Sequence, residues 1–458
     1  MLRLIKNEWI KIFTKISTYI MLILVLLFVV GFSGLMYLNS RYDTGYGYAV
    51  DPESELEYLT VSKPVGYELD AAMYEFIRDS GREWKYGEWQ MDAIQEAYED
   101  YGAPLLYQAD SLSEEEKQQL RIRLEEAQAS IMADDLEGYI EGKLDYVNET
   151  EEDEALREAK SYYWSYILDH GVVPGSGDWR ESAAAAVGSL KEELAVLESR
   201  KAAGEVITDE TIREVSDPLA LAEYRLDNGI QYYLDENGNT GDLFYNTWIQ
   251  GAMIVVLASV VMIVLAGGSV ANEFSNGTVK FLLINPVKRS KIIISKYLTL
   301  ILVAAVMIVG IFLVSGLTDL IFFGTDGLKT PMLLVEDGVV SQGNAMWYVL
   351  KQYLYQGVNL LVMMTMAFMI SSLLRNSAVS IGIGVAALMG GSMLVQILAM
   401  LGFDWGRYIL FANTDLVSIA NGNGLFANQS LTSAVVILAV YMAVFLLTAY
   451  DGFTRREV

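Results

Sequence analysis

Long apolar stretches alternate with polar segments along the chain, and six of them are long enough to cross a membrane as helices. They cover residues 18–38, 248–270, 292–323, 347–374, 378–401 and 432–450. A run of about 18 apolar residues has enough helical rise to span the hydrocarbon core, where only helices and closed barrels satisfy the backbone. Barrel strands would be shorter and would alternate apolar with polar positions, which these runs do not. The pattern therefore predicts an all-α membrane protein with six transmembrane helices.

Residues 1–17, ahead of the first run, have an amphipathic pattern. The apolar positions recur at steps of three and four and share one helical face, made of Leu2, Ile5, Trp9, Ile12 and Ile16. This predicts an interfacial helix in the headgroup layer; the alternative is a short basic lead-in to the first span.

The first run is longer than the apolar region of a typical signal peptide and no A-x-A-like site follows it, so we interpret it as a retained anchor.

The long polar segment between the first two spans, residues 39–247, carries most of the acidity. It holds 48 Asp and Glu against 17 Lys and Arg, a local balance of −31 in a chain whose net charge is −26, so the rest of the chain carries +5. Good helix formers dominate residues 111–147, 178–205 and 217–234, with an N-cap expected at Ser111 or Ser113 and a loop at 171–178. We expect a mainly helical domain outside the membrane. Its many aromatic residues, Trp84, Trp89, Tyr162, Tyr163 and Trp164 among them, either fill its core or form a surface that captures a cationic or amphipathic ligand.

The cations of the short loops indicate the orientation. They gather at four places: Arg3, Lys6, Lys11 and Lys15; Lys280, Lys288, Arg289, Lys291 and Lys296; Arg375; Arg455 and Arg456. With six spans these places lie on one side, which the positive-inside rule makes cytoplasmic. The opposite loops hold few cations, such as Lys329 and Arg407. Both termini, including the tail 451–458, are therefore expected on the cytoplasmic side of the bacterial cell membrane, and residues 39–247 on the outer side.

No chemistry of its own is evident in the chain. It has no G-x-x-x-x-G-K-[ST] motif to hold ATP, no cysteine, and His170 as its single histidine, which argues against a His- or Cys-based metal site or triad. We expect no enzyme, no bound cofactor and no metal. The carboxylate pairs of the polar segment are typical of solvated helix faces.

The middles of the six spans are nearly free of charge, which argues against an ion-coupled carrier. Asp319 and Lys351 are expected near the outer ends of the third and fourth spans, within reach of water, and Asn359 and Gln396 are the main polar side chains deep in the spans. A transport function would then need an energy source outside this chain.

The segment between the second and third spans, "NEFSNGTVKFLLINPVKRSKIIISKYL", resembles the coupling loop of ABC-2-type transporter permeases. The matching residues are Glu273, Gly277–Thr278, Phe281–Leu282–Leu283, Pro286, Arg289–Ser290 and Lys296. The six-span layout and the amphipathic N-terminal helix are similar too, so the resemblance covers residues 1–40 and 245–458. From the residues themselves, Asn276–Gly277 is a turn signal, Thr278 can cap a short helix that ends at Asn285–Pro286, and Ser290 can cap the next helix.

The resemblance implies that residues 271–291 dock into a separate ATP-binding subunit, with Glu273, Gly277, Thr278, Phe281, Leu282, Leu283, Pro286 and Arg289 as the coupling residues. It also implies two ATPase subunits, which bind the ATP and Mg²⁺, and two permease subunits, either identical or related. Without a partner, the same loop would be a basic segment that sets topology through lipid headgroups. Gly382, Ala386 and Gly390 lie four apart in the fifth span and could pack against another helix, within the chain or beyond it.

Three functions therefore stay open. The first is an ABC-type export permease for lipid-like or amphipathic cargo, such as antimicrobial peptides. The second is an ABC-type sensor or receptor complex whose outer domain binds an extracellular ligand, and the third is an ion-efflux permease. The outer domain is larger than in drug- and polysaccharide-exporting members and is more similar to the lantibiotic-immunity and sodium-efflux permeases.

Overall fold

The structure of the protein, a computed structural model, describes residues 1–42, 48–275 and 288–455. The chain divides into two compact units. The membrane unit comprises Met1–Tyr42, Tyr232–Met332 and Gln342–Val458, and the acidic unit comprises Asp43–Gln231 and Leu333–Ser341.

The membrane unit contains long apolar helices, and in the described residues six of them are long and apolar enough to cross a membrane, as predicted. They are α2 (Ile16–Tyr42), α12 (Leu243–Gly251) running through η2 (Ala252–Ile254) into α13 (Val255–Ser275), α15 (Arg289–Phe323), α16 (Ala345–Leu374), α17 (Ser377–Met400) and α19 (Leu431–Thr454). Several are longer than the predicted runs because their polar ends continue the helix beyond the apolar stretch, as expected for helices that project from a bilayer.

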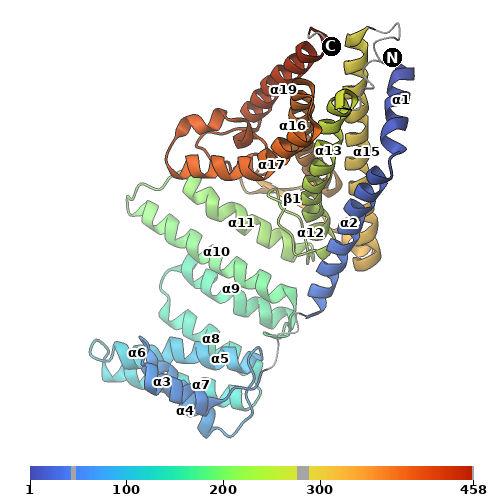
Figure 1. The fold of residues 1–458 in the computed structure, drawn as a ribbon. Coiled ribbons are helices and arrows are strands. Elements are labelled where there is room, and N and C mark those ends of the chain that lie inside the picture. Colours follow the sequence, from blue (N-terminus) through green and yellow to red (C-terminus); the bar gives the residue numbers. More distant parts are fainter. Residues whose placement is uncertain (43–47, 276–287, 456–458) are drawn as a thin grey trace. The chain divides into compact units, whose positions relative to one another are not determined.

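Within this unit α13 and α16 are the most enclosed helices and pack against each other (Figure 1). Small residues allow other segments to approach α17 closely, because a Cβ added at Gly384 would lie 2.7 Å from Ile263 on α13 and one at Gly391 would lie 2.3 Å from Phe411 on η5 (Leu410–Asn413). The outward sides of α2, α17 and α19 stay exposed and apolar, as expected of surfaces that face lipid or another apolar partner.

Shorter elements complete the membrane unit. They are α1 (Leu2–Phe13), η3 (Asp326–Lys329), η4 (Asp404–Tyr408), η5 (Leu410–Asn413) and α18 (Leu416–Ala420).

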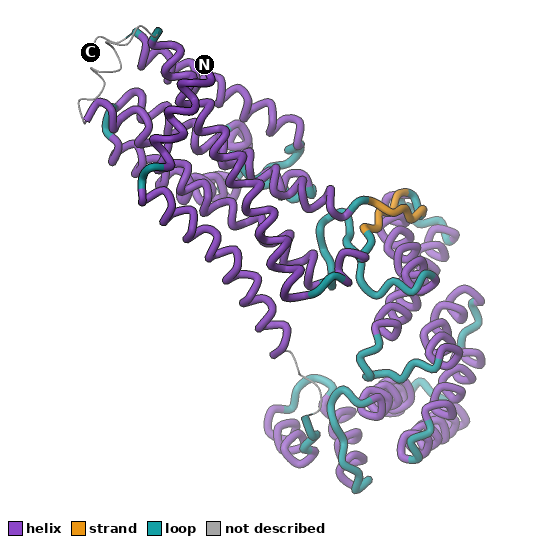
Figure 2. The backbone as a smooth tube through the Cα atoms, turned by 90° about the vertical axis from the view of Figure 1, so that its right-hand side faces the viewer, coloured by secondary structure: helices purple, strands orange, loops and turns teal. Residues whose placement is uncertain are grey.

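A two-stranded sheet between α15 and α16 contradicts the purely α-helical prediction. Strands β1 (Met332–Glu336) and β2 (Val339–Gly343), drawn in orange in Figure 2, are joined by Asp337 and Gly338, whose φ angles are 50° and 74°. Positive φ at both central residues is what a two-residue hairpin turn of type I′ requires, and Asp-Gly is among the sequences that supply it. The Asp-Gly pair between two apolar runs was therefore a readable hairpin signal.

The acidic unit is helical, as predicted. Its helices are α3 (Pro52–Ser62), α4 (Tyr67–Asp79), α5 (Trp89–Ala97), the π-turn η1 (Tyr98–Gly102), α6 (Ala103–Tyr107), α7 (Glu114–Met132), α8 (Leu136–Thr150), α9 (Glu154–His170), α10 (Trp179–Ala202) and α11 (Asp209–Asp227). Ser113 caps α7 in a capping box with Glu116. The stretch 111–147 is two helices because Asp134 takes a φ of 59° between them.

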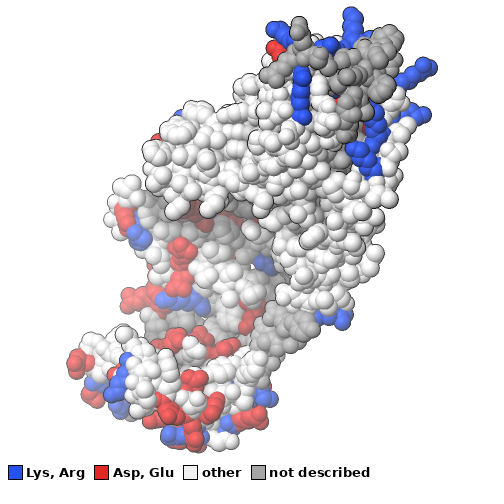
Figure 3. All heavy atoms as spheres, in the orientation of Figure 1, with Lys and Arg blue, Asp and Glu red and all other residues white. Residues whose placement is uncertain are grey.

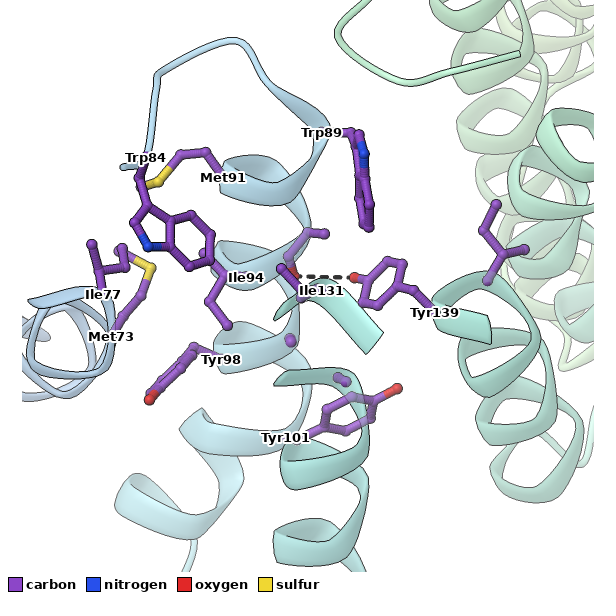
Figure 4. Packing of buried hydrophobic residues seen from close by; sticks show 14 of the residues in the cluster. Met73, Ile77, Trp84, Trp89, Met91, Ile94, Tyr98, Tyr101, Ile131 and Tyr139 are labelled. Atoms are coloured by element: carbon purple, nitrogen blue, oxygen red, sulfur yellow. Dashed lines mark hydrogen bonds between the residues drawn. The ribbon is translucent and has the colours of Figure 1, made fainter. Parts of the chain in front are cut away.

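The aromatic residues of this unit mostly fill its core (Figure 4). Trp84, Trp89 and Trp164 are buried in one hydrophobic cluster, and Tyr163 packs against it. The Oη of the fully buried Tyr139 donates a hydrogen bond of 3.1 Å to the backbone oxygen of Ala93. The aromatic content is therefore explained largely by packing.

The boundaries of the polar domain differ from the predicted 39–247. The end of that segment, from Tyr232 onward, packs with the membrane unit, whereas part of the hairpin joins the acidic unit. There the Arg213 guanidinium contacts Asp337 at 3.0 Å, and the backbone N–H of Gly338 donates to Asp217 at 2.7 Å. The predicted helix 217–234 ends early, at Asp227.

Candidate functional site

Four charged side chains from three helices meet at one end of the membrane unit, and we name them the charge cluster: Glu8 and Lys11 of α1, Glu273 of α13 and Lys296 of α15. The Lys296 Nζ lies 2.9 Å from Glu8 Oε2 and 2.6 Å from Glu273 Oε1. The Lys11 Nζ lies 3.1 Å from Glu8 and 3.2 Å from Glu273. Each cation therefore contacts both carboxylates.

Burial separates the two lysines of the charge cluster. The side chain of Lys296 is 2% exposed, against 54% for Lys11, and the two carboxylates are 14% and 12% exposed. Lys296 donates a third hydrogen bond of 3.2 Å to the backbone oxygen of Ser269. A buried ammonium is tolerated only when its charge and its donors are matched, and Lys296 meets both conditions.

The charges on α1 reinforce each other. Burial on its own raises the pKa of Glu8, but the ammonium groups of Lys296 and Lys11 outweigh it, so the pKa lies below its usual value. Burial lowers the pKa of Lys11, but Glu8 and Glu273 outweigh it, so this pKa lies above its usual value. Both groups of α1 are therefore charged across the neutral range.

Hydrogen bonds to the backbone of α1 strengthen its attachment to the membrane unit. The hydroxyl of Thr18 donates to the backbone oxygen of Ile12 at 2.8 Å, and the hydroxyl of Thr299 on α15, shared with the backbone oxygen of Ser295 at 2.8 Å, lies 3.4 Å from the backbone oxygen of Ile5. The inward face differs from the predicted one: Leu2 and Ile16 are exposed, whereas the half-buried positions are Leu4, Ile5, Glu8, Trp9, Ile12 and Phe13. The face contains a carboxylate because that carboxylate is paired with Lys296.

An open pocket of about 510 Å³ lies beside the charge cluster. All four charged side chains line it, together with Lys15, Asn272 and residues at the start of α17. The cluster can therefore be reached from outside the protein, although its central lysine is buried.

The end of α13 is held by α16 and α19 as well. The Ser371 hydroxyl of α16 accepts from the backbone N–H of Ala271 at 3.0 Å and donates to the backbone oxygen of Gly267 at 2.7 Å, two groups that pair directly in a regular helix. Phe274 lies under the Arg375 guanidinium at 4.2 Å and contacts the ring of Phe453 on α19. The last turn of α13 is thus tied to four other helices.

The predicted coupling residues divide between described and undescribed parts of the chain. Glu273 lies in the charge cluster, and Arg289 is the first residue of α15. Gly277, Thr278, Phe281, Leu282, Leu283 and Pro286 lie outside the described residues. Ser290 does not cap α15 as predicted, because the helix begins at Arg289 and its N-cap position is Lys288, two residues earlier.

Sequence reasoning singled out Glu273 and Lys296 but missed Glu8 and the pairing role of Lys11. A signal was present, since Glu8 is the single carboxylate among the first 42 residues. It falls between Ile5 and Ile12 on the apolar face, where an unpaired charge would be costly.

The expectation that Asp319 reaches water is wrong, because it is fully buried between helices. Lys351 and Asn359 are half-buried, and Gln396 is exposed on the outward side of α17. Within residues 1–42, 48–275 and 288–455, no group of three or more His, Asp or Glu side chains is placed to hold a metal ion.

Comparison with known proteins places the membrane unit in a family. The model of the family described as "Protein of unknown function (DUF2705)" matches residues 220–458, which include α12, α13 and every later span. The chain belongs to the DUF2705 family. Its matched region contains Glu273 and Lys296, whereas Glu8 and Lys11 lie outside it.

Two relatives come from Bacillus subtilis (strain 168). "Uncharacterized protein YhcI" is 33% identical over 299 residues, which are 64% of this chain and 90% of the relative. "Uncharacterized membrane protein YdbK" is 31% identical over 204 residues, 44% of this chain and 78% of the relative. No solved structure matches the chain. The six apolar helices and the membrane-protein relative together indicate a multi-pass membrane protein.

Proposed function

We propose that the chain is the membrane-spanning permease subunit of a bacterial ABC transporter that exports a lipid-like or amphipathic compound, such as an antimicrobial peptide. In this proposal ATP and Mg²⁺ are bound by a separate ATPase subunit, two copies of which contact residues 271–291 of two permease subunits. The permease supplies the pathway and performs no hydrolysis itself.

The charge cluster is the observation that carries this proposal. Glu273 and Lys296 flank the segment 276–287, and their contact of 2.6 Å joins the helix before it to the helix after it. Glu8 adds α1 to the same junction at 2.9 Å. A force applied to the segment between them would therefore act on α13, α15 and α1 together, which is what an externally powered permease requires.

The proposed orientation follows the distribution of charge. Figure 3 shows Lys and Arg side chains gathered at the end of the membrane unit that holds the start of α1 and the end of α19, the end of the charge cluster. Exposed cations at this end include Arg3, Lys6 and Lys288. By the positive-inside rule this end is cytoplasmic, so both termini lie in the cytoplasm and the acidic unit lies outside.

An open face on α17 supports a second permease subunit. Nothing within the described chain lies within 4 Å of a Cβ added at Gly382 or Gly390, and Ala386 between them is exposed. The close intrachain approaches of α17 use Gly384 and Gly391 instead. The small-residue face is therefore available to a helix of another chain.

The test is purification of the full-length chain, expressed with its native partners, followed by measurement of bound ATPase activity. Replacing Phe281 and Leu282 together by Asp should abolish that activity while membrane insertion stays normal, because apolar contacts with the ATPase are lost. Lys288→Asp is the control, since it adds a carboxylate to the same loop and removes no apolar side chain. Undiminished ATPase binding by the double variant would refute the coupling role, and so would solute movement by the chain alone down an ion gradient.

A pocket in the acidic unit favours the receptor function as a second candidate. It measures about 120 Å³, and Trp89, Tyr163 and Trp164 line it together with the carboxylates of Asp92, Glu96 and Glu181. Aromatic faces and carboxylates attract organic cations. Deleting residues 50–240 separates the candidates, since retained export would exclude an obligatory receptor role and lost signalling with intact ATPase binding would favour it.

A further inference from the structure

The carboxyl of Asp319 is buried in the membrane unit without a hydrogen-bond partner. Its residue is 0% exposed, and neither of its side-chain oxygens has a partner among the described residues. It lies 23 residues beyond Lys296 on α15, which corresponds to about 35 Å of helix, slightly more than the hydrocarbon thickness. Asp319 is therefore at the opposite end of the membrane unit from the charge cluster.

Four helices surround this carboxyl. The hydroxyls of Ser33 on α2 and Ser315 on α15 lie beside it, but neither donates to it with ordinary geometry. Tyr353 on α16 is also close, yet its Oη donates to the backbone oxygen of Trp248 on α12 at 2.9 Å. The Ser33 oxygen is itself buried and unpaired.

Basic side chains at this end of the membrane unit are engaged elsewhere. Arg41 lies over the ring of Tyr37 at 4.8 Å, Lys329 pairs with Asp326 at 2.8 Å, and Lys351 lies over the ring of Tyr348 at 5.5 Å. No salt bridge to Asp319 is present among the described residues. Among the described titratable groups of α2, α12 and α16, the one that interacts electrostatically with Asp319 is Tyr353. A tyrosine hydroxyl carries no positive charge, so it cannot neutralise the carboxylate.

An ionised carboxylate in such a place is unfavourable, because it has lost its hydration, faces no cation, and receives no hydrogen bond of ordinary geometry from the two serine hydroxyls beside it. Neutralisation by a proton removes the charge and also creates a donor. The new O–H can bond to the unpaired oxygen of Ser33 or to that of Ser315, so one proton satisfies two buried groups. We propose that Asp319 is a proton-binding site of the membrane unit, occupied in this packed arrangement and emptied when the surrounding helices separate.

Tight packing favours a proton over a metal ion here. A Cβ added at Gly251 would lie 2.5 Å from Ser315 Oγ and 2.8 Å from Tyr353 Oη, and one at Gly316 would lie 2.6 Å from the ring of Trp248. A monovalent metal ion needs room for several oxygen ligands, whereas a proton needs none. The site thus adds a proton-linked step to a membrane unit whose spans are otherwise nearly free of charge.

The proposal is tested by infrared spectroscopy of the full-length chain in lipid vesicles at neutral pH without Na⁺. Wild type should show the C=O stretch of one protonated carboxylic acid that Asp319→Asn lacks, and Asp326→Asn, which changes an exposed aspartate at the same end, should retain it. If Asp319→Asn fails to fold, both wild type and Asp319→Glu are labelled with ¹³C-aspartate. The acid band must then shift in wild type and stay unshifted in Asp319→Glu, whose glutamate carries no label. The assignment is overturned if the signal that Asp319→Asn lacks relative to wild type is that of an ionised carboxylate. It is also overturned if added NaCl abolishes the acid band, which would make Na⁺ the ligand.

Discussion

Replacing Lys296 by Met tests whether the charge cluster holds α1 on the membrane unit. Methionine keeps the length and the apolar stem of the side chain and removes the ammonium. The 2.9 Å contact with Glu8 and the 2.6 Å contact with Glu273 are both lost. Two largely buried carboxylates then face each other with Lys11 as their one remaining cation in the cluster.

The two lysines differ in expected cost because they differ in burial. Removing one partner of a buried ion pair costs about 3–5 kcal/mol, and Lys296 is 2% exposed. Lys11, at 54% exposure, belongs with surface pairs that contribute at most about 1 kcal/mol. Lys296→Met should therefore raise the equilibrium constant for detachment of α1 roughly a hundredfold to several thousandfold. Lys11→Met should raise the same constant no more than about fivefold.

The absence of cysteine from the chain makes this opening measurable. Thr299 on α15 is fully buried, and its hydroxyl contacts the backbone of Ile5 on α1. A Thr299→Cys thiol should react with a water-soluble maleimide when α1 detaches, so its labelling rate in lipid nanodiscs reports the local opening.

The reasoning would be refuted if Lys296→Met and Lys11→Met gave similar labelling rates, or if neither changed the rate. Adding Glu8→Gln to Lys296→Met provides an internal check. It removes one of the two carboxylates left facing each other and should recover part of the loss.

Three further outcomes are expected. Tyr139→Phe should destabilise the acidic unit by about 1 kcal/mol in denaturant unfolding, since the buried hydrogen bond from Tyr139 to the backbone oxygen of Ala93 is lost. Burial raises the pKa of Glu181, so its ionisation opposes folding, and its contribution to stability is present below its unfolded pKa and is lost as the pH rises through the folded one. Glu181→Gln should therefore remove this part of the pH dependence of the melting temperature, whereas Glu198→Gln should leave the slope unchanged. Gly390→Leu should weaken association of permease subunits, measured by single-molecule photobleaching in membranes, whereas Gly310→Leu on α15 should not.

Each of these has a contradicting result. Unfolding of Tyr139→Phe at the wild-type denaturant midpoint would show that the hydrogen bond contributes nothing. An identical pH slope in Glu181→Gln and wild type would exclude that carboxyl as a source of the dependence. Equal association of the two leucine variants would remove the α17 face from the interface.

Hydrophobic pattern was sufficient to find the spans because membrane crossing is decided by local composition and length. Helix starts in the acidic unit were also readable where a side chain caps its own helix, as Ser113 does with Glu116. The hairpin at Asp337–Gly338 was missed, although its turn residues signalled it. These are local features, and the sequence carries local information directly.

The candidate sites depend on contacts that no local pattern contains. Lys296 meets Glu8 across 288 positions of sequence, so the importance of Glu8 becomes visible only when α1 is placed against α15. Asp319 lies near the end of its helix, which suggested access to water, yet helices from distant parts of the chain close around it. In both cases tertiary packing decides whether a charged side chain is solvated, paired or neutralised.

One helix connects the two buried polar sites of the membrane unit. α15 carries Lys296 at one end and Asp319 at the other, and its 35 residues contain no proline to interrupt the hydrogen-bonded backbone. We expect such a helix to transmit a displacement at the charge cluster to its far end, which would shift that end relative to α2, α12 and α16. If work enters at residues 271–291, separation of these helices would hydrate Asp319 and release its proton. Protonation at one end would then depend on attachment at the other, and the two proposals can be tested against each other in a single protein.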